Sequence, residues 1–408
     1  MAVPAIVSTA SDPAAVTITQ TLGRTGVPIH TLSNMAHPAA AYSRYVTVRH
    51  RTPVGPGGSD IRDNVHEPES LLDYIIDNVE RGVLFPGSDC NVRFLSRHKD
   101  RLSEAGFLLC VPDERALTTA LNKSDVARFC TEKGFPVPRT SVIDSADDLE
   151  RARDELQFPV VLKGVFKKNH KLVKTKEELG ARYAEFLRGF AGKTEMLQAV
   201  AQEWIPGGSD AFAKLYVMCD HAGTLVATHQ LRRLRIHTRK DGSQGDTLIA
   251  KTERIPELAE QWVPFFEALG WVGMASMECK YDERDGRYKL IEINPRPWAI
   301  LKVSVDCGVD IPLLYYRLAQ GLAVERTTDF DERYYIRLLW GRQGIPEPVA
   351  SLAMLMNGHI HVSEILGTYS RLAINATRLS IDVGSLRDPL PTLAAVYHHG
   401  IRNFKMWF

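Results

Sequence analysis

The most informative segment of this sequence is Leu290-Ile291-Glu292-Ile293-Asn294-Pro295-Arg296-Pro297-Trp298. Its polar and apolar residues alternate, and successive side chains of a β-strand point to opposite faces, so Glu292, Asn294 and Arg296 are expected to share one face. A carboxylate and an amide oxygen two residues apart suit a hard cation such as Mg2+, which often also takes oxygens from substrate phosphates. The adjacent guanidinium suits a phosphate or a carboxylate. The segment therefore predicts a strand that carries a metal site and an anion site.

A second carboxylate precedes this strand in a predicted β-hairpin. Residues 273–281 have the pattern of a strand, residues 282–287 form the turn, and the chain returns from Tyr288. Pairing across the hairpin is expected to bring Glu278 beside Glu292, and two carboxylates at close range need a cation between them. The alternative interpretation is a hairpin whose acidic side chains face solvent.

The composition is that of an ordinary globular protein. The chain has 408 residues, enough for two or three domains, with 44% apolar residues, 24% charged residues and a net charge of +1. This balance gives no reason to expect nucleic acid or an anionic membrane as a partner. The six cysteines lack any Cys-x-x-Cys spacing, and we find neither a signal segment nor a run of about eighteen apolar residues. We therefore expect free thiols and a cytoplasmic location.

The first 115 residues alternate short apolar runs with helical patterns, which predicts a parallel sheet with helices on its faces. No Gly-x-Gly-x-x-Gly motif follows the first predicted strand, so a dinucleotide site is not expected. Asp89 follows a predicted strand at 83–86, and sheets of this kind place ligand contacts at the carboxyl ends of their strands. Asp89 is therefore a candidate substrate residue, with a turn or helix cap as the alternative.

Two lysines stand out in the next part of the chain. Lys163 lies in the apolar strand predicted over residues 158–165, and a buried ammonium needs an anion because burying it unpaired is costly. Lys123 lies just ahead of a predicted helix with Ser124 or Asp125 as the expected cap, a position that suits a phosphate. The alternatives are a strand that ends in solvent at Lys163 and an ordinary surface lysine at Lys123.

Glu278 together with Glu292-Ile293-Asn294-Pro295-Arg296 resembles the metal-binding end of the ATP-grasp superfamily, whose members mostly couple ATP cleavage to the activation of a carboxylate as an acyl phosphate. The resemblance rests on specific motifs over residues 115–322 and on pattern alone over residues 1–114. It implies an α/β chain with three parts. These are an N-terminal parallel-sheet preATP-grasp domain (1–115), a two-subdomain ATP-grasp α+β domain with the nucleotide and metal site (116–325), and a C-terminal α/β extension of unknown role (326–408).

The resemblance also implies roles for these motifs. Lys123 and Lys163 would hold ATP phosphates, and Arg296 would stabilise the group being transferred. The implied ligands of Mg2+, with Mn2+ as a substitute, are Glu278, Glu292 and Asn294. The basic segment 166–174 occupies the position of the mobile lid of the family, although it lacks the usual glycines, and a solvated basic loop is the equal alternative.

The segment Glu203-Trp204-Ile205 resembles the hinge between the two subdomains of ATP-grasp proteins. Adenine needs a donor and an acceptor at one ring edge and apolar contacts on its faces, and an extended backbone segment supplies these. The resemblance implies that Glu203 and a backbone carbonyl bind the exocyclic amine, and that the Ile205 amide meets a ring nitrogen. Asp210 matches the position that holds ribose hydroxyls, with a turn aspartate as the alternative.

Arg233 and Arg235 lie two residues apart in a predicted strand over residues 225–236 and are expected to share one face. They are candidate substrate residues because guanidinium groups bind carboxylates and phosphates. A basic strand that faces solvent is the alternative. The glycine-containing loop at 242–245 would either close over substrate or serve only as a connection.

The resemblance as a whole implies an ADP-forming carbon-nitrogen ligase, most like the group that includes D-aspartate ligases and peptide ligases. Its substrates would be ATP and a small-molecule carboxylate and amine, with amino acids as the expected class, and members of the family are often homodimers. One alternative is carboxy-phosphate or carbamoyl-phosphate chemistry, which ranks lower because no biotin-carrier motif and no glutaminase domain is evident. The other is a nucleotide-binding regulatory protein that has lost catalysis.

Overall fold

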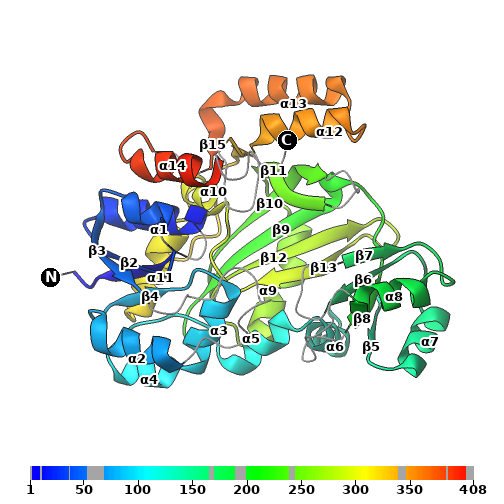
Figure 1. Ribbon diagram of the computed structural model, residues 1–408, viewed down its shortest axis with the longest axis horizontal. Helices are drawn as coiled ribbons and strands as arrows, with labels where there is room; N and C mark the ends of the chain where they lie inside the picture. Colours follow the sequence, from blue (N-terminus) through cyan, green and yellow to red (C-terminus); the bar gives the residue numbers. More distant parts are fainter. Residues whose placement is uncertain are drawn as a thin grey trace.

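The computed structural model describes residues 2–9, 12–35, 37–52, 69–164, 170–188, 199–238, 244–338, 346–382 and 385–400. The described strands form three sheets, and the seven-stranded sheet lies between the two four-stranded sheets (Figure 1). Within the described residues, no helix is long and apolar enough to cross a membrane.

The N-terminal sheet has four parallel strands in the order β3-β2-β1-β4. The strands are β1 (Ala5–Ser8), β2 (Ile29–Ser33), β3 (Val46–Arg51) and β4 (Val83–Phe85). Ala5 and Val7 pack with α1 (Asp12–Arg24) on one face, while Ile6 packs with α2 (Glu69–Asn78) on the other. The predicted parallel sheet with helices on both faces is thus confirmed. Beyond this sheet, Leu108 forms an isolated parallel bridge with Val83.

Helices α3 (Asp89–Arg97), α4 (Lys99–Glu104), α5 (Glu114–Leu121) and α6 (Lys123–Lys133) lead to the second sheet. This sheet is antiparallel, in the order β5-β8-β6-β7. Its strands are β5 (Thr140–Ile143), β6 (Val160–Gly164), β7 (His170–Val173) and β8 (Ala199–Glu203). Helices α7 (Ala146–Glu155) and α8 (Leu179–Arg188) cover one face, so the other face is directed at the rest of the molecule (Figure 1).

The third sheet has seven strands in the order β13-β12-β9-β10-β11-β14-β15. The strands are β9 (Phe212–Cys219), β10 (Leu225–Thr238), β11 (Gln244–Thr252), β12 (Gly273–Asp282), β13 (Arg287–Asn294), β14 (Tyr334–Ile336) and β15 (Leu379–Ile381). The aromatic residues of α9 (Pro256–Ala268) pack against one face. Helices α10 (Leu301–Asp306) and α11 (Ile311–Ala319) pack in one continuous core with the N-terminal sheet.

The C-terminal part of the chain contributes to two of these layers. Strands β14 and β15 extend the large sheet, and α12 (Glu347–Met356) and α13 (Val362–Ile374) lie over β10 and β11. The short helix α14 (Leu390–Ala395) lies instead beside the N-terminal domain (Figure 1). Just before α14, the buried Asp388 carboxylate accepts hydrogen bonds from Gln20, Ser43 and the Arg44 amide. The segment just before α14 is therefore held to the N-terminal part of the chain by buried hydrogen bonds.

Candidate functional site

The predicted hairpin forms, and Glu278 on β12 is the direct partner of Glu292 on β13. The register shifts beside this pair, because Cys279 pairs with Leu290 and leaves Ile291 as an extra residue. Beyond the bulge, Ile293 and Pro295 are buried while Asn294 and Arg296 are partly exposed. The predicted alternation is therefore confirmed from Glu292 to Arg296, and direct cross-strand pairing places the two carboxylates side by side.

Two protein cations hold Glu278. Its carboxylate lies 2.8 Å from Arg233 Nη1 and 3.1 Å from Lys214 Nζ, and only 14% of its side chain is exposed. Burial by itself would raise the pKa of Glu278, but the charges of Arg233 and Lys214 outweigh burial and hold the pKa at about 2. Glu278 is thus ionised at any physiological pH. Lys214 was missed by the sequence analysis, although a lysine inside the apolar strand β9 was a usable signal.

Lys163 on β6 and Lys123 on α6 lie near this carboxylate pair. Burial lowers the pKa of Lys163 to about 8, helped by the charge of Lys123 and opposed by Glu292 and Glu278. Burial likewise lowers the pKa of Lys123, opposed by Glu292 and Asp89. The structure therefore brings together two lysines and two carboxylates that are far apart in the sequence, and it leaves the lysines less stable as cations than in water.

The start of α6 differs from the expectation in one detail. The N-cap is Asn122, whose side chain accepts hydrogen bonds from the amides of Ser124 and Asp125, so the expectation that Ser124 or Asp125 caps the helix was wrong. Lys123 is consequently the first residue of the helix, at the positive end of the helix dipole, which favours an anion.

The segment after β8 is held by backbone contacts. The Trp204 amide donates to the Pro159 carbonyl (3.0 Å), and the Glu203 carboxylate accepts from the Gln157 amide (3.0 Å). Within the described residues, the amide of the buried Ile205 donates no hydrogen bond. A ring nitrogen would satisfy that amide. Asp210 lies in a short 3-10 turn (Ser209–Ala211) with an exposed side chain.

Asp89 and Arg296 form an ion pair of 2.9 Å between α3 and the end of β13. Ser88 is the N-cap of α3, accepting from the Asn91 amide, so Asp89 is not the cap. Arg296 also donates to the side-chain oxygen of Asn294 (3.3 Å). The structure thus joins a candidate substrate residue of the N-terminal domain to the candidate metal strand.

Arg235 does not accompany Arg233, which corrects the prediction that they share a face. The pairing of β10 with β11 is irregular between them, so the alternation of side chains is interrupted. The Arg235 guanidinium instead donates to Glu347 (2.6 Å), Ser351, the Glu364 carbonyl and Thr368 of α12 and α13. The Arg235 guanidinium is thus held by protein groups under the C-terminal helices, away from the Glu278 carboxylate that Arg233 contacts.

Two of the predicted loops lie wholly or partly outside the described residues. Residues 166–169 of the candidate lid lie outside the described residues, and residues 170–173 of its remaining part form β7. Residues 239–243, with Gly242 and Ser243 of the second candidate loop, are likewise outside the described part.

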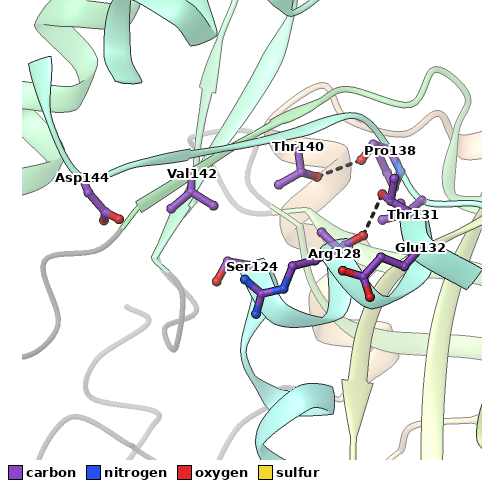
Figure 2. Close-up of a pocket in the computed structure, with 10 residues that line it drawn as sticks. Ser124, Arg128, Thr131, Glu132, Pro138, Thr140, Val142 and Asp144 are labelled. Carbon is purple, nitrogen blue, oxygen red and sulfur yellow. Dashed lines mark hydrogen bonds between the residues drawn. The ribbon is translucent and has the colours of Figure 1, made fainter. Parts of the chain in front are cut away.

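A cavity of about 470 Å³ lies between α6 and β5 (Figure 2). Its lining combines charged, hydroxyl and apolar side chains. The lining residues are Ser124, Ala127, Arg128, Thr131, Glu132, Val137, Pro138, Thr140, Val142 and Asp144. None of the predicted site residues is among them, but Thr140 is connected to Lys163 through the side chain of Gln202.

The fold is that of the ATP-grasp proteins, which confirms the resemblance. The biotin carboxylase domain of the 2-oxoglutarate carboxylase of Hydrogenobacter thermophilus, determined as a dimer with MgADP, ADP and bicarbonate, matches with a TM-score of 0.64 and 15% identity. The match covers 82% of this chain and 74% of that one. N5-carboxyaminoimidazole ribonucleotide synthetase from Thermotoga maritima matches with a TM-score of 0.58 and 16% identity over 84% of this chain and 82% of that one. At such identities the likeness establishes the fold alone.

Two curated proteins show similarity in sequence. The D-aspartate ligase of Enterococcus faecium is 27% identical over 241 residues, or 54% of this chain and 54% of that enzyme. The acetyl-CoA carboxylase of Saccharomyces cerevisiae is 25% identical over 205 residues, or 48% of this chain and 8% of that protein. The chain therefore spans about half the length of the D-aspartate ligase. No protein-family model matches the chain. These relatives and structural neighbours are ADP-forming ligases of the ATP-grasp type.

Proposed function

We propose that this chain is an ADP-forming ligase that activates a carboxylate as an acyl phosphate and joins it to an amine. The observation that carries the proposal is the Glu278–Glu292 pair. Lys123 on α6 and Lys163 on β6 of the second sheet lie near this pair. Two carboxylates suit a divalent cation, and two partly desolvated ammonium groups suit a polyphosphate. ATP with Mg2+ has both features.

The oxygens of the hairpin fit Mg2+. Within the described part of the chain, no cluster of three or more His, Cys, Asp or Glu side chains is arranged to hold a metal by itself. Two carboxylates and the Asn294 amide oxygen remain, and Mg2+ is commonly bound by one or two carboxylates together with substrate phosphates. Bound there by Glu278, Glu292 and Asn294, Mg2+ would neutralise charge on the nucleotide phosphates. Because Arg233 and Lys214 keep Glu278 ionised, that ligand needs no deprotonation.

The nucleotide is proposed to lie between the second and third sheets. The amide of Ile205 would donate to a nitrogen of the adenine ring, Glu203 and Trp204 would line its edge and face, and the exposed Asp210 would accept from ribose hydroxyls. The Glu203 carboxylate already accepts from a backbone amide, so its contact with the exocyclic amine would use its remaining lone pairs.

The chemistry needs charge stabilisation and no side-chain nucleophile. An oxygen of the substrate carboxylate attacks the γ-phosphorus, the bond to the β-phosphate oxygen breaks, and ADP leaves. The amine, which binds as an ammonium, loses one proton to become a nucleophile, its nitrogen attacks the acyl carbon, the bond to phosphate breaks, and the nitrogen loses a second proton as the amide forms. Lys123, Lys163 and Arg296 would stabilise the charge on the transferring phosphoryl group.

Arg233 and Asp89 are the proposed substrate contacts. Arg233 is a guanidinium at the edge of the metal site and suits the carboxylate substrate, while Asp89 suits the ammonium form of the amine. The similarity to a D-aspartate ligase supports amino acids as the substrate class. A homodimer remains part of the proposal, supported by the dimeric biotin carboxylase neighbour.

The test is the release of ADP and phosphate from Mg-ATP in the presence of pairs from a panel of amino acids and small carboxylates. We expect release that requires one acid and one amine and that is lost in Glu292→Ala. Glu283→Ala, an exposed acid in the turn of the same hairpin, is the control and should behave as the wild type. Failure of the wild-type chain to bind ATP would overturn the proposal.

The second candidate is carboxylation through carboxy-phosphate, favoured by structural neighbours that include carboxylases with bound bicarbonate. In that case ADP release would depend on bicarbonate and would persist without an organic acid. A nucleotide-binding regulatory protein would instead bind ATP without turnover on any substrate pair. The presence of both candidate metal carboxylates and of Arg296 supports the enzyme over this reading.

A further inference from the structure

Three side chains of the second sheet form a hydrogen-bonded chain that ends at Lys163. Lys163 Nζ donates to Gln202 Oε1 (2.5 Å), Gln202 Nε2 donates to Thr140 Oγ1 (3.1 Å), and Thr140 Oγ1 donates to the Pro138 carbonyl (2.8 Å). The strand register explains the arrangement, because Thr140 is the direct partner of Gln202, and Gln202 lies opposite Val161, two residues before Lys163.

The donors and acceptors in these three hydrogen bonds are determined by the groups at the two ends. A hydroxyl has one hydrogen, and Thr140 gives it to Pro138, so towards Gln202 the hydroxyl oxygen only accepts. An ammonium only donates, so the group of Gln202 that faces Lys163 has to be the carbonyl oxygen. Figure 2 shows the Thr140 hydroxyl directed at Pro138 on the wall of the cavity beside α6.

A neutral acceptor has a particular effect on a lysine that binds phosphate. It fixes the position of the ammonium without neutralising its charge, whereas a carboxylate at the same place would compete with the phosphate. The charged groups that face Lys163 from the neighbouring elements are Lys123 on α6, Glu292 on β13 and Glu278 on β12. Among the described residues, the hydrogen bond recorded for the Lys163 ammonium is the one to Gln202.

We propose that Gln202, oriented by Thr140, is a positioning residue that holds the Lys163 ammonium towards the phosphates of the bound nucleotide. This inference rests on the proposed function for its ligand, and the contact itself is tested without any nucleotide. Gln202 and Thr140 act through Lys163 and touch no reacting atom.

The first experiment measures the titration of Lys163 in the full chain without nucleotide, by competitive acetylation and mass spectrometry across the alkaline pH range. In Gln202→Glu the pKa of Lys163 should rise from its present value of about 8, because a carboxylate replaces a neutral acceptor. In Thr140→Val the amide loses its fixed orientation and the pKa should fall. Thr140→Ser keeps the hydroxyl and should restore the wild-type titration. Unchanged titration in both Gln202→Glu and Thr140→Val would overturn the proposal.

The second experiment compares the affinities of ATP, ADP and adenosine by calorimetry. Thr140→Val should weaken ATP and ADP binding about tenfold, equivalent to about 1.4 kcal/mol, and leave adenosine binding unchanged. Thr131→Val is the matched control, because Thr131 lines the same cavity but donates to the Ala127 carbonyl and takes no part in the hydrogen bonds that lead to Lys163. Equal weakening for ATP and adenosine would indicate a distorted cleft and overturn the positioning role. If wild-type chain binds no ATP, the proposed function fails, and the titration of Lys163 still decides whether Gln202 holds it.

Discussion

Lys280 on β12 donates a hydrogen bond of 2.8 Å to the carbonyl oxygen of Ile205, the residue whose amide is the proposed contact of adenine. The same ammonium donates to the Gly207 carbonyl (2.8 Å) and lies over the rings of Trp204 (4.6 Å) and Phe212 (4.9 Å). Since Glu278 precedes Lys280 by two residues on the same strand, β12 carries both a candidate metal ligand and the anchor of the nucleotide segment.

The first prediction concerns this anchor. In Lys280→Met two carbonyls lose their charged donor, which should cost about 1–3 kcal/mol of stability and weaken ATP binding because the 203–207 segment is no longer held. Chemical denaturation and calorimetry with ATP measure the two effects. Lys133→Met, at an exposed position at the end of α6, is the control. Wild-type affinity for ATP in Lys280→Met would show that the anchor is not needed.

The second prediction is a pH dependence that originates at Glu278. The pKa of Glu278 is about 2 in the folded chain against an ordinary 4.5, so its ionisation contributes stability above about pH 4.5, and this contribution is lost as the pH falls towards 2. The full contribution is roughly 3 kcal/mol. The difference in unfolding free energy between wild type and Glu278→Gln should therefore shrink over this range, as urea denaturation at several pH values would measure. A difference that stays constant with pH would contradict the assignment.

The third prediction separates Arg235 from Arg233. Glu347→Gln removes the negative charge from a fully buried ion pair and should destabilise the chain by about 3–5 kcal/mol, because Arg235 stays buried without a counter-charge. The double variant Arg235→Met/Glu347→Leu should recover much of that loss. At a temperature where both variants are folded, ADP release should be retained, whereas Arg233→Met should lose it. Loss of turnover in the folded double variant would show that Arg235 is needed for the reaction.

The fourth prediction concerns the attachment of the C-terminal segment to the N-terminal domain. Asp388→Asn replaces one carboxylate oxygen with a donor, so the hydrogen bonds from Ser43, Gln20 and the Arg44 amide cannot all remain. We expect faster amide exchange in α1 and in the 3-10 helix Ala39–Tyr42, with little change in α9. Hydrogen exchange followed by mass spectrometry measures this. If amide exchange in α1 and in Ala39–Tyr42 were the same in Asp388→Asn as in the wild type, the segment would be held by other contacts.

Local patterns were sufficient for much of the fold. The alternation of apolar runs and helical segments predicted the parallel N-terminal sheet, and the residues around Glu292 predicted the hairpin and its pairing with Glu278. Alternating residues and short apolar runs predict these strands correctly, because the burial of a strand face determines which residue types occur at neighbouring positions of the sequence. The same rule failed at Arg235, because a strand irregularity interrupts the period and leaves no clear mark in the sequence.

The class of fold and most of the candidate site residues can be predicted from local sequence, since the motif at 290–298, the lysine in an apolar strand and the segment after β8 each span only a few residues. Which side chains meet is visible only in the folded protein. It paired Asp89 with Arg296, placed Lys214 and Arg233 on Glu278, joined Gln202 to Lys163, and directed Arg235 to the C-terminal helices. The physical reason is that these contacts join residues distant in the chain, and their geometry depends on strand register and bulges rather than on local composition.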